Sequence, residues 1–491
     1  MNLKPLDSQI DLGHLINGQW NHDHTTKVDI HSPYTGDVIG NYHGASNTLV
    51  NKGIEFASEA FESWGKVPLK ERTQVMFRFR EILQSRINEI ANVVSLENGK
   101  TIGESKAGLM KGIEVLEFAL SLQNMDSGAK MEVSRGVHCE YRRKPLGVIA
   151  NITPFNFPAM VPMWTLPIAM TLGNTYIWKP SEKTPLTSQW IANAFKDAGL
   201  PDGVLTVLQG GREVSEAIID HPLVKAVGFV GSTSVAQSVY RRGTALGKRV
   251  LALGGAKNHI ILLPDSTPQI CGRGISDSFT GCAGQRCMAA SVLLAVGDCE
   301  DQIAAIKERA ASLKMGEDMG AIITKEQVEF LHGAIAQAEK DGAKIILDGR
   351  KVAPPSEYKG GYWLGPTILD HVSPESEAAT RELFGPVISI IRCKNISEAM
   401  AIENSNPYGN ACSVFTSNGG LAEQVVESAK AGMVGINIGV PVPREPFSFG
   451  GIQDSKFGHG DITGAHSLDF WTDVRKVTTK WTMQSDHNWM S

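Results

Sequence analysis

A short segment around Cys287 carries the residue types most typical of nucleophilic chemistry. It reads Gly281-Cys-Ala-Gly-Gln-Arg-Cys287, with two cysteines five residues apart and no nearby histidine. That spacing is unlike a zinc site, and we expect no metal here. Arg286 and a glycine-containing turn precede Cys287, and a neighbouring cation with free backbone N–H groups favours the nucleophilic thiolate. Cys287 is therefore a candidate nucleophile; the alternative is a small buried apolar residue. Cys282 is interpreted as structural.

Asn156 is a candidate donor to an oxyanion. It lies in the run Asn151-Ile-Thr-Pro-Phe-Asn156-Phe-Pro158, directly after a predicted strand, where aromatic residues and prolines stiffen the loop. An amide fixed in such a place can stabilise negative charge that develops on a carbonyl oxygen. The alternative is an asparagine that satisfies the backbone of a turn.

Two further segments follow predicted strands and could bind a nucleotide. Gly231-Ser-Thr233 follows the strand at 226–230, and the free N–H groups and dipole of a helix start suit a pyrophosphate. An ordinary helix start is the alternative. Lys179 and Glu182 follow the strand at 175–178, and ligands bind at the carboxyl ends of parallel strands. These two residues could bracket an adenosine ribose, or they could belong to a solvated charged loop.

The hydrophobic pattern predicts a scaffold that would align these segments. Residues 50–120 show apolar side chains at helical spacing and form a predicted helical layer. Short apolar runs then alternate with helix-length segments, which predicts a parallel, doubly wound sheet suited to dinucleotide binding. These runs lie at 147–152, 175–178, 204–208, 226–230 and 249–253. A second α/β domain is predicted from runs at 260–263, 291–296, 345–347, 387–391, 413–415 and 435–438.

Two extended stretches fit neither sheet. Residues 123–144 and the tail near 470–481 alternate in hydrophobicity as strands do. Such strands can pair at an edge between subunits, so we expect a homo-oligomer, either a dimer or a tetramer.

Composition excludes several classes of protein. The 491 residues imply roughly two to three structural units, and the net charge of -5 makes nucleic acid an unexpected partner. The apolar stretch at 161–178 is interrupted by Pro162 and Pro167, so we expect no membrane-spanning helix. Seven irregularly spaced cysteines and an N-terminus without a signal-like apolar region indicate a reducing compartment, and we expect a cytoplasmic protein.

Taken together, Lys179 with Glu182, Gly231-Ser232, Asn156, Gly-Gln-Arg-Cys287 and Glu382-Leu-Phe-Gly-Pro386 make the chain resemble the aldehyde dehydrogenase superfamily over essentially its whole length. The resemblance implies that Cys287 is the nucleophile and that the Asn156 amide and the Cys287 N–H form the oxyanion hole. It implies a dinucleotide site whose residues are Thr153, Phe155, Lys179, Glu182, Lys183, Ser232, Gly254, Glu382 and Phe384.

Within that site, the resemblance gives each part of the cofactor its partners. Lys179 and Glu182 would hold the adenosine ribose, Ser232 the pyrophosphate and Glu382 the nicotinamide ribose. A carboxylate at Glu182 should repel a 2′-phosphate, which favours NAD over NADP. Residues 1–122 and 145–254 would form the NAD-binding domain and 255–459 the catalytic domain. Residues 123–144 and 460–491 would form bridging or oligomerisation segments.

One departure from the superfamily concerns a general base. Hydrolytic members carry a Glu before Leu-Gly-Gly-Lys, whereas this chain reads Leu251-Ala-Leu-Gly-Gly-Ala-Lys257. Matching on Leu-Gly-Gly puts Ala252 at that position, and matching on Lys257 puts Leu253 there. Neither can activate water for hydrolysis of a thioester on Cys287. A thiol such as coenzyme A attacks thioesters with less need of that base, so CoA acylation is expected.

Several runs narrow the resemblance to the CoA-acylating methylmalonate-semialdehyde dehydrogenases, among them Ala256-Lys-Asn-His259, Gly284-Gln-Arg-Cys-Met288 and Asn406-Pro-Tyr-Gly-Asn410. This subfamily oxidatively decarboxylates methylmalonate and malonate semialdehydes to propionyl-CoA and acetyl-CoA. Arg286 would then pair with the substrate carboxylate. Lys111 stands where the subfamily usually has a second Arg. A lysine keeps the positive charge but cannot form the two parallel hydrogen bonds that an arginine makes to a carboxylate. Two other functions stay open: a hydrolytic aldehyde dehydrogenase in which another carboxylate replaces the missing Glu, and a non-catalytic dinucleotide-binding protein.

Overall fold

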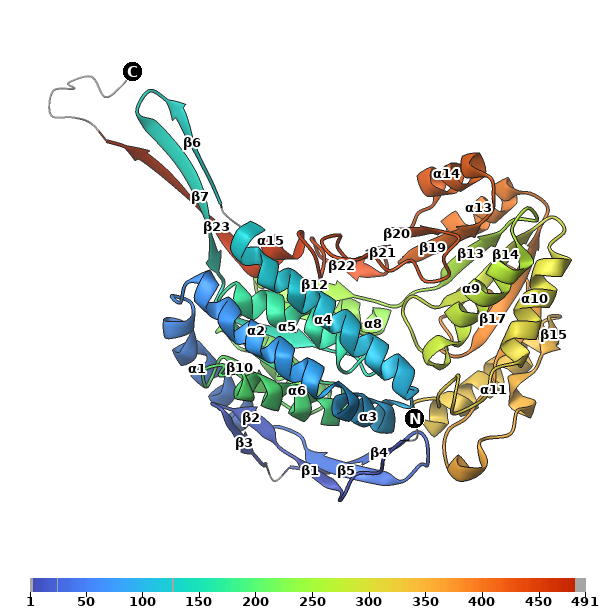
Figure 1. Ribbon diagram of the computed structural model, residues 1–491, viewed down its shortest axis with the longest axis horizontal. Coiled ribbons are helices and arrows are strands. Elements are labelled where there is room, and N and C mark those ends of the chain that lie inside the picture. Colours follow the sequence, from blue (N-terminus) through green and yellow to red (C-terminus); the bar gives the residue numbers. More distant parts are fainter. Residues whose placement is uncertain (1–2, 24, 126–127, 482–491) are drawn as a thin grey trace.

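The computed structural model describes residues 3–23, 25–125 and 128–481. Parts of the two expected bridging segments, residues 126–127 and 482–491, lie outside the described residues. Two large sheets dominate the described part of the chain and lie in separate lobes, the first built mainly from the N-terminal half and the second from the C-terminal half (Figure 1).

The first sheet contains the predicted doubly wound core. Its order is β22-β12-β11-β8-β9-β10-β2-β3, and the strands from β12 to β10 are parallel, as predicted. The antiparallel hairpin of β2 and β3 and the short β22 extend its two edges. The bounds are β2 His14–Ile16, β3 Gln19–Asn21, β8 Val148–Ile152, β9 Thr175–Lys179, β10 Leu205–Val207, β11 Val224–Val230, β12 Arg249–Leu253 and β22 Lys456–Phe457. Residues 456–457 thus pair with the first sheet, although they fall within the expected 255–459 domain.

Helices cover both faces of this sheet because its strands alternate their buried side chains. On β12, Leu251 and Leu253 join the apolar cluster beneath α2 to α6, whereas Val250 and Ala252 join the cluster beneath α1, α7 and α8. The helices predicted at 50–120 are present as α1 to α4, but the expected single layer is wrong, because α1 packs on the opposite face of the sheet from α2, α3 and α4. The bounds are α1 Asn47–Trp64, α2 Leu69–Ser85, α3 Ile87–Asn98, α4 Ile102–Met125, α5 Met160–Thr171, α6 Leu186–Asp197, α7 Arg212–Asp220 and α8 Thr233–Ala245.

The second sheet has the order β15-β16-β17-β14-β13-β19-β20 and is parallel except where β15 meets β16. The hydrophobic pattern predicts its other strands but not β16, a four-residue strand, Thr367–Asp370. The remaining bounds are β13 Asn258–Leu262, β14 Ala290–Val296, β15 Lys344–Leu347, β17 Val387–Cys393, β19 Ala411–Phe415 and β20 Met433–Ile436. Its helices are α9 Pro268–Thr280, α10 Glu300–Ala311, α11 Lys325–Lys340, α12 Glu377–Thr380, α13 Ile396–Ser405 and α14 Gly419–Ser428.

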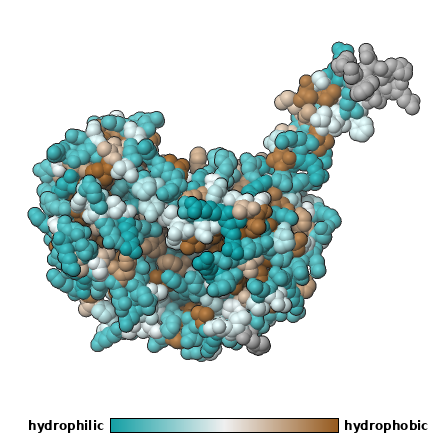
Figure 2. Space-filling view, turned by 180° about the vertical axis from the view of Figure 1, so that it is seen from behind, coloured by the Kyte–Doolittle hydropathy of each residue, from teal (hydrophilic) through white to brown (hydrophobic). Residues whose placement is uncertain are grey.

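A third sheet projects from the first lobe as an arm made of β6 (Ala129–Ser134), β7 (Val137–Pro145) and β23 (Thr472–Lys480) (Figure 1). The extended stretches predicted near 123–144 and 470–481 therefore pair with each other. Two parts are helical instead: α4 continues to Met125, and α15 (Ser467–Trp471) includes residues 470–471. Apolar side chains gather on the arm (Figure 2), and the exposed ones include Met131, Val133, Tyr141 and Val474.

Short elements complete the described residues. They are β1 Ile10–Leu12, β4 Lys27–His31, β5 Val38–His43, β18 Tyr408–Gly409, β21 Ile452–Gln453, α15 Ser467–Trp471 and the 3-10 turns Gly281–Gly284, Gly349–Lys351 and Ser356–Tyr358. Within residues 3–23, 25–125 and 128–481, no helix combines the length and the apolar character needed to cross a bilayer.

Candidate active site

The segment before Cys287 is a tight turn held in left-handed backbone geometry. It follows α9 as the 3-10 turn Gly281–Gly284, with φ of 54° at Cys282 and 51° at Ala283. Non-glycine residues in that region cost about 1–3 kcal/mol each and persist where surrounding contacts hold them. A Cβ added at Gly284 would lie 2.0 Å from the Gly385 carbonyl oxygen. Glycine at 284 therefore lets the nucleophile turn approach the segment that follows Glu382.

Two buried asparagines hold the backbone of Cys287 itself. The Asn258 and Asn410 side-chain amides each donate to the Cys287 carbonyl oxygen, at 2.7 and 2.8 Å. Both asparagines occur in runs that carry the family resemblance, but the sequence reasoning assigned them no role. A local sequence signal could not have found this role, because Asn410 lies 123 residues from Cys287 along the chain.

The Cys287 thiol is partly buried, and its surroundings favour the neutral form. Burial is the main cause that raises its pKa to about 12, and the Glu382 carboxylate raises it further. Arg286 and Lys100 oppose this shift, with smaller effects. The expectation that Arg286 and the turn make a resting thiolate is therefore wrong for this structure, since burial outweighs the nearby cations. Attack by sulfur requires that the proton leave during the reaction.

The Arg286 guanidinium points toward the end of α9. Its Nη2 donates to the carbonyl oxygens of Asp277 and Ser278, at 2.5 and 2.7 Å, both in the last turn of that helix. The Asp277 carbonyl also accepts from the Gly281 N–H, and a cation at this place meets the negative end of the helix dipole. The expected pairing of Arg286 with a substrate carboxylate stays a prediction. Nη2 bonds the end of α9, whereas the buried Nε has no partner within the described residues.

Lys111 is also engaged within the chain. Its ammonium bonds the Glu114 carboxylate at 3.0 Å and the Pro443 carbonyl oxygen at 3.4 Å. Glu445 lies nearby, and burial raises its pKa to about 7 while the Lys111 charge lowers it. A substrate carboxylate that binds Lys111, as expected, must therefore compete with the carboxylates of Glu114 and Glu445.

Asn156 reaches the nucleophile turn across the two lobes. Its side-chain amide nitrogen donates to the Gln285 carbonyl oxygen at 3.1 Å. An Asn amide has two N–H donors, so one remains for an oxygen beside Cys287. This placement supports the predicted oxyanion donor.

The predicted pyrophosphate site lies at the start of α8. Ser232 is the N-cap residue and is exposed, and within the described residues its hydroxyl makes no capping bond. The first N–H groups of α8 therefore suit an anion. The Thr233 hydroxyl accepts from the Gly255 N–H at 2.9 Å. The neighbouring Gly254 donates its N–H to the Ser455 carbonyl, and a Cβ there would lie 2.8 Å from the Asp454 carbonyl oxygen.

The predicted ribose site lies at the end of β9. The Lys179 ammonium is buried and donates to the Gly210 carbonyl at 2.8 Å, with the Glu182 carboxylate 3.5 Å away. Burial lowers the Lys179 pKa, whereas Glu182 is exposed and open to a ligand. Thr153 accepts from the Trp178 indole at 2.9 Å and so fixes the neighbouring loop.

Two aromatic rings bring the lobes together beside this loop. Phe155 and Phe384 meet edge to face with ring centroids 5.8 Å apart, and the Lys183 ammonium lies 5.1 Å from the Phe155 centroid. Glu382 accepts from the Ala256 N–H at 3.0 Å. Burial raises its pKa to about 7, against the Ala256 bond and the Lys257 charge. Glu382, predicted to hold the nicotinamide ribose, therefore lies where its charge acts on Cys287.

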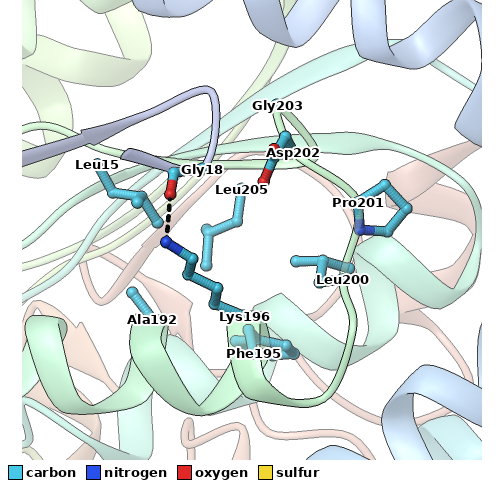
Figure 3. A pocket seen from close by; sticks show the side chains of 10 residues that line it. All are labelled: Leu15, Gly18, Ala192, Phe195, Lys196, Leu200, Pro201, Asp202, Gly203 and Leu205. Carbon is cyan, nitrogen blue, oxygen red and sulfur yellow. Dashed lines mark hydrogen bonds between the residues drawn. The ribbon is translucent and has the colours of Figure 1, made fainter. Parts of the chain in front are cut away.

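The pocket in Figure 3 lies elsewhere in the first lobe, between α6 and the hairpin of β2 and β3. Its charged lining residues are Lys196 and Asp202, and the Lys196 ammonium bonds the Gly18 carbonyl at 2.8 Å. None of its lining residues belongs to the predicted site.

Comparison with known proteins agrees with this geometry. The model of the aldehyde dehydrogenase family matches residues 20–477. A malonate-semialdehyde dehydrogenase of Geobacillus kaustophilus is 38% identical over 479 residues, covering 96% of this chain and 99% of the relative.

Two crystal structures extend the comparison. A putative methylmalonate-semialdehyde dehydrogenase of Sinorhizobium meliloti 1021, complexed with NAD, superposes with a TM-score of 0.95 at 34% identity, covering 98% of this chain and all of that one. A methylmalonate-semialdehyde dehydrogenase of Oceanimonas doudoroffii gives a TM-score of 0.94 at 38% identity, with 97% and 99% of the two chains covered. The predicted α/β aldehyde dehydrogenase fold is confirmed, and the chain belongs to the aldehyde dehydrogenase family.

Proposed function

We propose that this enzyme is an NAD-dependent, CoA-acylating dehydrogenase that oxidatively decarboxylates malonate or methylmalonate semialdehyde to acetyl-CoA or propionyl-CoA. The names of the relatives support the substrate class. The side chains of β12 support the acylating outcome. The seven free cysteines support a reducing, cytoplasmic location.

The observation that carries the proposal is the apolar character of the β12 side chains, which join two different clusters. Leu253 belongs to the apolar cluster that also contains Met288 and against which Cys287 packs. Ala252 points into the cluster on the opposite face of the sheet. Leu253 is therefore the residue on the nucleophile's side, and it cannot activate water. A thioester on Cys287 lacks a base from this strand, which favours transfer to a thiol.

The residues present fit a dinucleotide. The uncapped start of α8 suits the pyrophosphate, Lys179 and Glu182 suit a ribose, and Glu382 suits the second ribose. The exposed carboxylate at Glu182 favours NAD over NADP. When bound, NAD accepts the hydride that the substrate carbon loses.

The chain's own residues supply the remaining chemistry. The Cys287 sulfur attacks the aldehyde carbon as its proton leaves, and Asn156 with the Cys287 N–H holds the resulting oxyanion. Loss of hydride leaves a thioester on Cys287. By resemblance, the β-carboxylate then leaves as carbon dioxide with the thioester carbonyl as electron sink. The CoA thiol takes the acyl group and Cys287 is regenerated.

An assay of products with and without CoA tests this proposal. Malonate, methylmalonate and succinate semialdehydes and propanal are each incubated with NAD, and both NADH and acyl-CoA are quantified. We expect the first two substrates to give stoichiometric NADH and acyl-CoA, with steady-state turnover falling sharply when CoA is omitted. Equal turnover without CoA, with a free acid as product, would contradict the acylating function.

One observation favours hydrolysis as a second candidate function. Glu382 is a buried carboxylate that acts electrostatically on Cys287, and its pKa near 7 suits a general base. Because that pKa is raised, the carboxylate is protonated below about pH 7 and ionised above it. Hydrolysis through Glu382 should therefore rise between about pH 6 and 8, and Glu382→Gln should remove the rise. A flat pH profile for free-acid formation excludes this role.

We also propose that the arm mediates homo-oligomerisation into a dimer or tetramer. Its outer strands β6 and β23 each have an edge unpaired within the described residues, and exposed Met131 and Val133 give β6 an apolar surface. Light scattering should give a multiple of the 53.1 kDa chain mass, and Met131→Lys with Val133→Lys should weaken assembly. A monomer with wild-type sequence would contradict this proposal.

A further inference from the structure

The connection between α3 and α4 contacts two active-site segments, the loop that carries Asn156 and the turn that precedes Cys287. No residue of this connection belongs to the predicted site. Gly99, with φ of 89°, ends α3, and Thr101 and Glu104 form a capping box at the start of α4. The Thr101 N–H donates to Glu104 Oε2 at 2.9 Å, and the Glu104 N–H donates to the Thr101 hydroxyl at 3.2 Å. The box fixes the Glu104 side chain and leaves its second oxygen for another partner.

That second oxygen holds the nucleophile turn. Glu104 Oε1 accepts from the Cys282 N–H at 2.5 Å, across 178 residues of chain. Cys282 is one of the residues in left-handed geometry, so its backbone needs a contact that stabilises it. A charge-assisted bond to a carboxylate is among the stronger ones available.

Lys100 holds the oxyanion loop from the same connection. Its buried ammonium donates to the Asn156 carbonyl oxygen and lies 4.0 Å from the centroid of the Phe157 ring. The Lys100 carbonyl in turn accepts from the Tyr34 hydroxyl at 3.0 Å, and the Gly99 carbonyl accepts from the Ala321 N–H at 2.7 Å. The connection is therefore fixed from both lobes, at the place where the start of α4 approaches the second lobe (Figure 1).

We propose that Lys100 and Glu104 are positioning residues that hold Asn156 and the Cys287 turn at a fixed separation. The proposal rests on Cys287 being the nucleophile, but not on the identity of the substrate or on CoA.

The test measures NADH formation from propanal, in the first turnover and at steady state, in Lys100→Met, Lys100→Arg and Glu104→Gln. We expect Lys100→Met to lower the first-turnover rate and kcat by roughly 10- to 100-fold with little change in KM. Lys100→Arg keeps a charged donor for the Asn156 carbonyl, so it should restore most of the lost rate. Glu104→Gln loses one carboxylate acceptor, so it should lower kcat by about 10-fold with little change in KM.

Lys340→Met provides the control, because Lys340 is an exposed lysine at the end of α11 and its loss should change neither readout. Unchanged kcat in both Lys100→Met and Glu104→Gln overturns the proposal. If Lys100→Met does not fold, an unchanged kcat in Glu104→Gln overturns it. The first turnover of NADH formation needs no CoA, so failure of the acylating function leaves this test intact.

Discussion

The cofactor side and the nucleophile side of the site are built in different ways. On the cofactor side, Lys179 and Glu182 are three residues apart at the end of β9, and Ser232 directly precedes α8. On the nucleophile side, Cys287 is held by contacts that span much of the chain. Asn156 reaches Gln285 across 129 residues, and Asn410 reaches Cys287 across 123.

Because of this difference, cofactor binding and the positions of the reacting groups depend on different parts of the fold. A nucleotide binds to groups that local strand–turn–helix structure already presents. The sulfur and its oxyanion donor come from loops of two different sheets, so their separation depends on packing between lobes. Changes on the nucleophile side should therefore affect kcat most, and changes on the cofactor side should affect KM for NAD.

Loss of the nucleophile should have the largest effect. Cys287→Ala should lower NADH formation by about 1000-fold or more, because no covalent intermediate can form. Absorbance at the NADH band measures this directly, and NAD binding followed by calorimetry should stay near wild type. Substantial turnover in the variant would contradict the role of Cys287.

Loss of the oxyanion donor should come next. Asn156→Ala removes the amide that reaches Gln285 and should lower kcat by about 100- to 1000-fold. KM for the aldehyde should change little, since the lost bond forms mainly in the transition state. Rapid-quench measurement of the first turnover distinguishes this from slow product release. An unchanged rate of the first turnover would exclude Asn156 as the donor.

Loosening the backbone of Cys287 should have a smaller effect. Asn410→Ala leaves one of two amide bonds to the Cys287 carbonyl and should lower kcat by roughly 10-fold through misplacement of the sulfur. Asn404 is a matched control in the same lobe, because its side chain bonds the Ser428 carbonyl and the Lys430 N–H. Asn404→Ala should keep its kcat. Equal losses in both variants would indicate a general effect on the fold.

A change on the cofactor side should affect binding instead. Glu182→Ala should raise KM for NAD by about 10-fold, the value of a hydrogen bond to a charged group, and leave kcat near wild type. Discrimination against NADP should fall as well, because the repelling carboxylate is gone. Initial rates with each dinucleotide measure both effects. A lower kcat with unchanged KM would break the proposed division between the two sides.

The same division explains what the sequence could predict. Short apolar runs separated by helix-length segments identify most strands of both sheets. A strand buried on both faces of a parallel sheet carries almost only apolar side chains, so it stands out as such a run. The runs miss β16 of the second sheet and the short edge strands β2, β3 and β22 of the first sheet. Cysteine, arginine and glycine types in the 281–287 run indicate a nucleophile, but not the direction of the Arg286 side chain. The resting pKa of Cys287 depends on burial and on Glu382, neither of which the run contains.

At Arg286, the sequence predicts a bond to the substrate carboxylate, whereas in the structure the side chain bonds the end of α9. Replacement of Arg286 should therefore have the smallest kinetic effect of these substitutions. Arg286→Met removes bonds to the Asp277 and Ser278 carbonyls and should destabilise the protein by about 2 kcal/mol. If Arg286 acts only as the α9 cap, KM for malonate semialdehyde relative to propanal should change by less than about 2-fold. A rise of about 10-fold for the carboxylated substrate alone would be worth about 1.4 kcal/mol. That result would mean that the guanidinium also binds the substrate carboxylate, and thermal unfolding with and without malonate semialdehyde would then show whether binding weakens or keeps its bonds to α9.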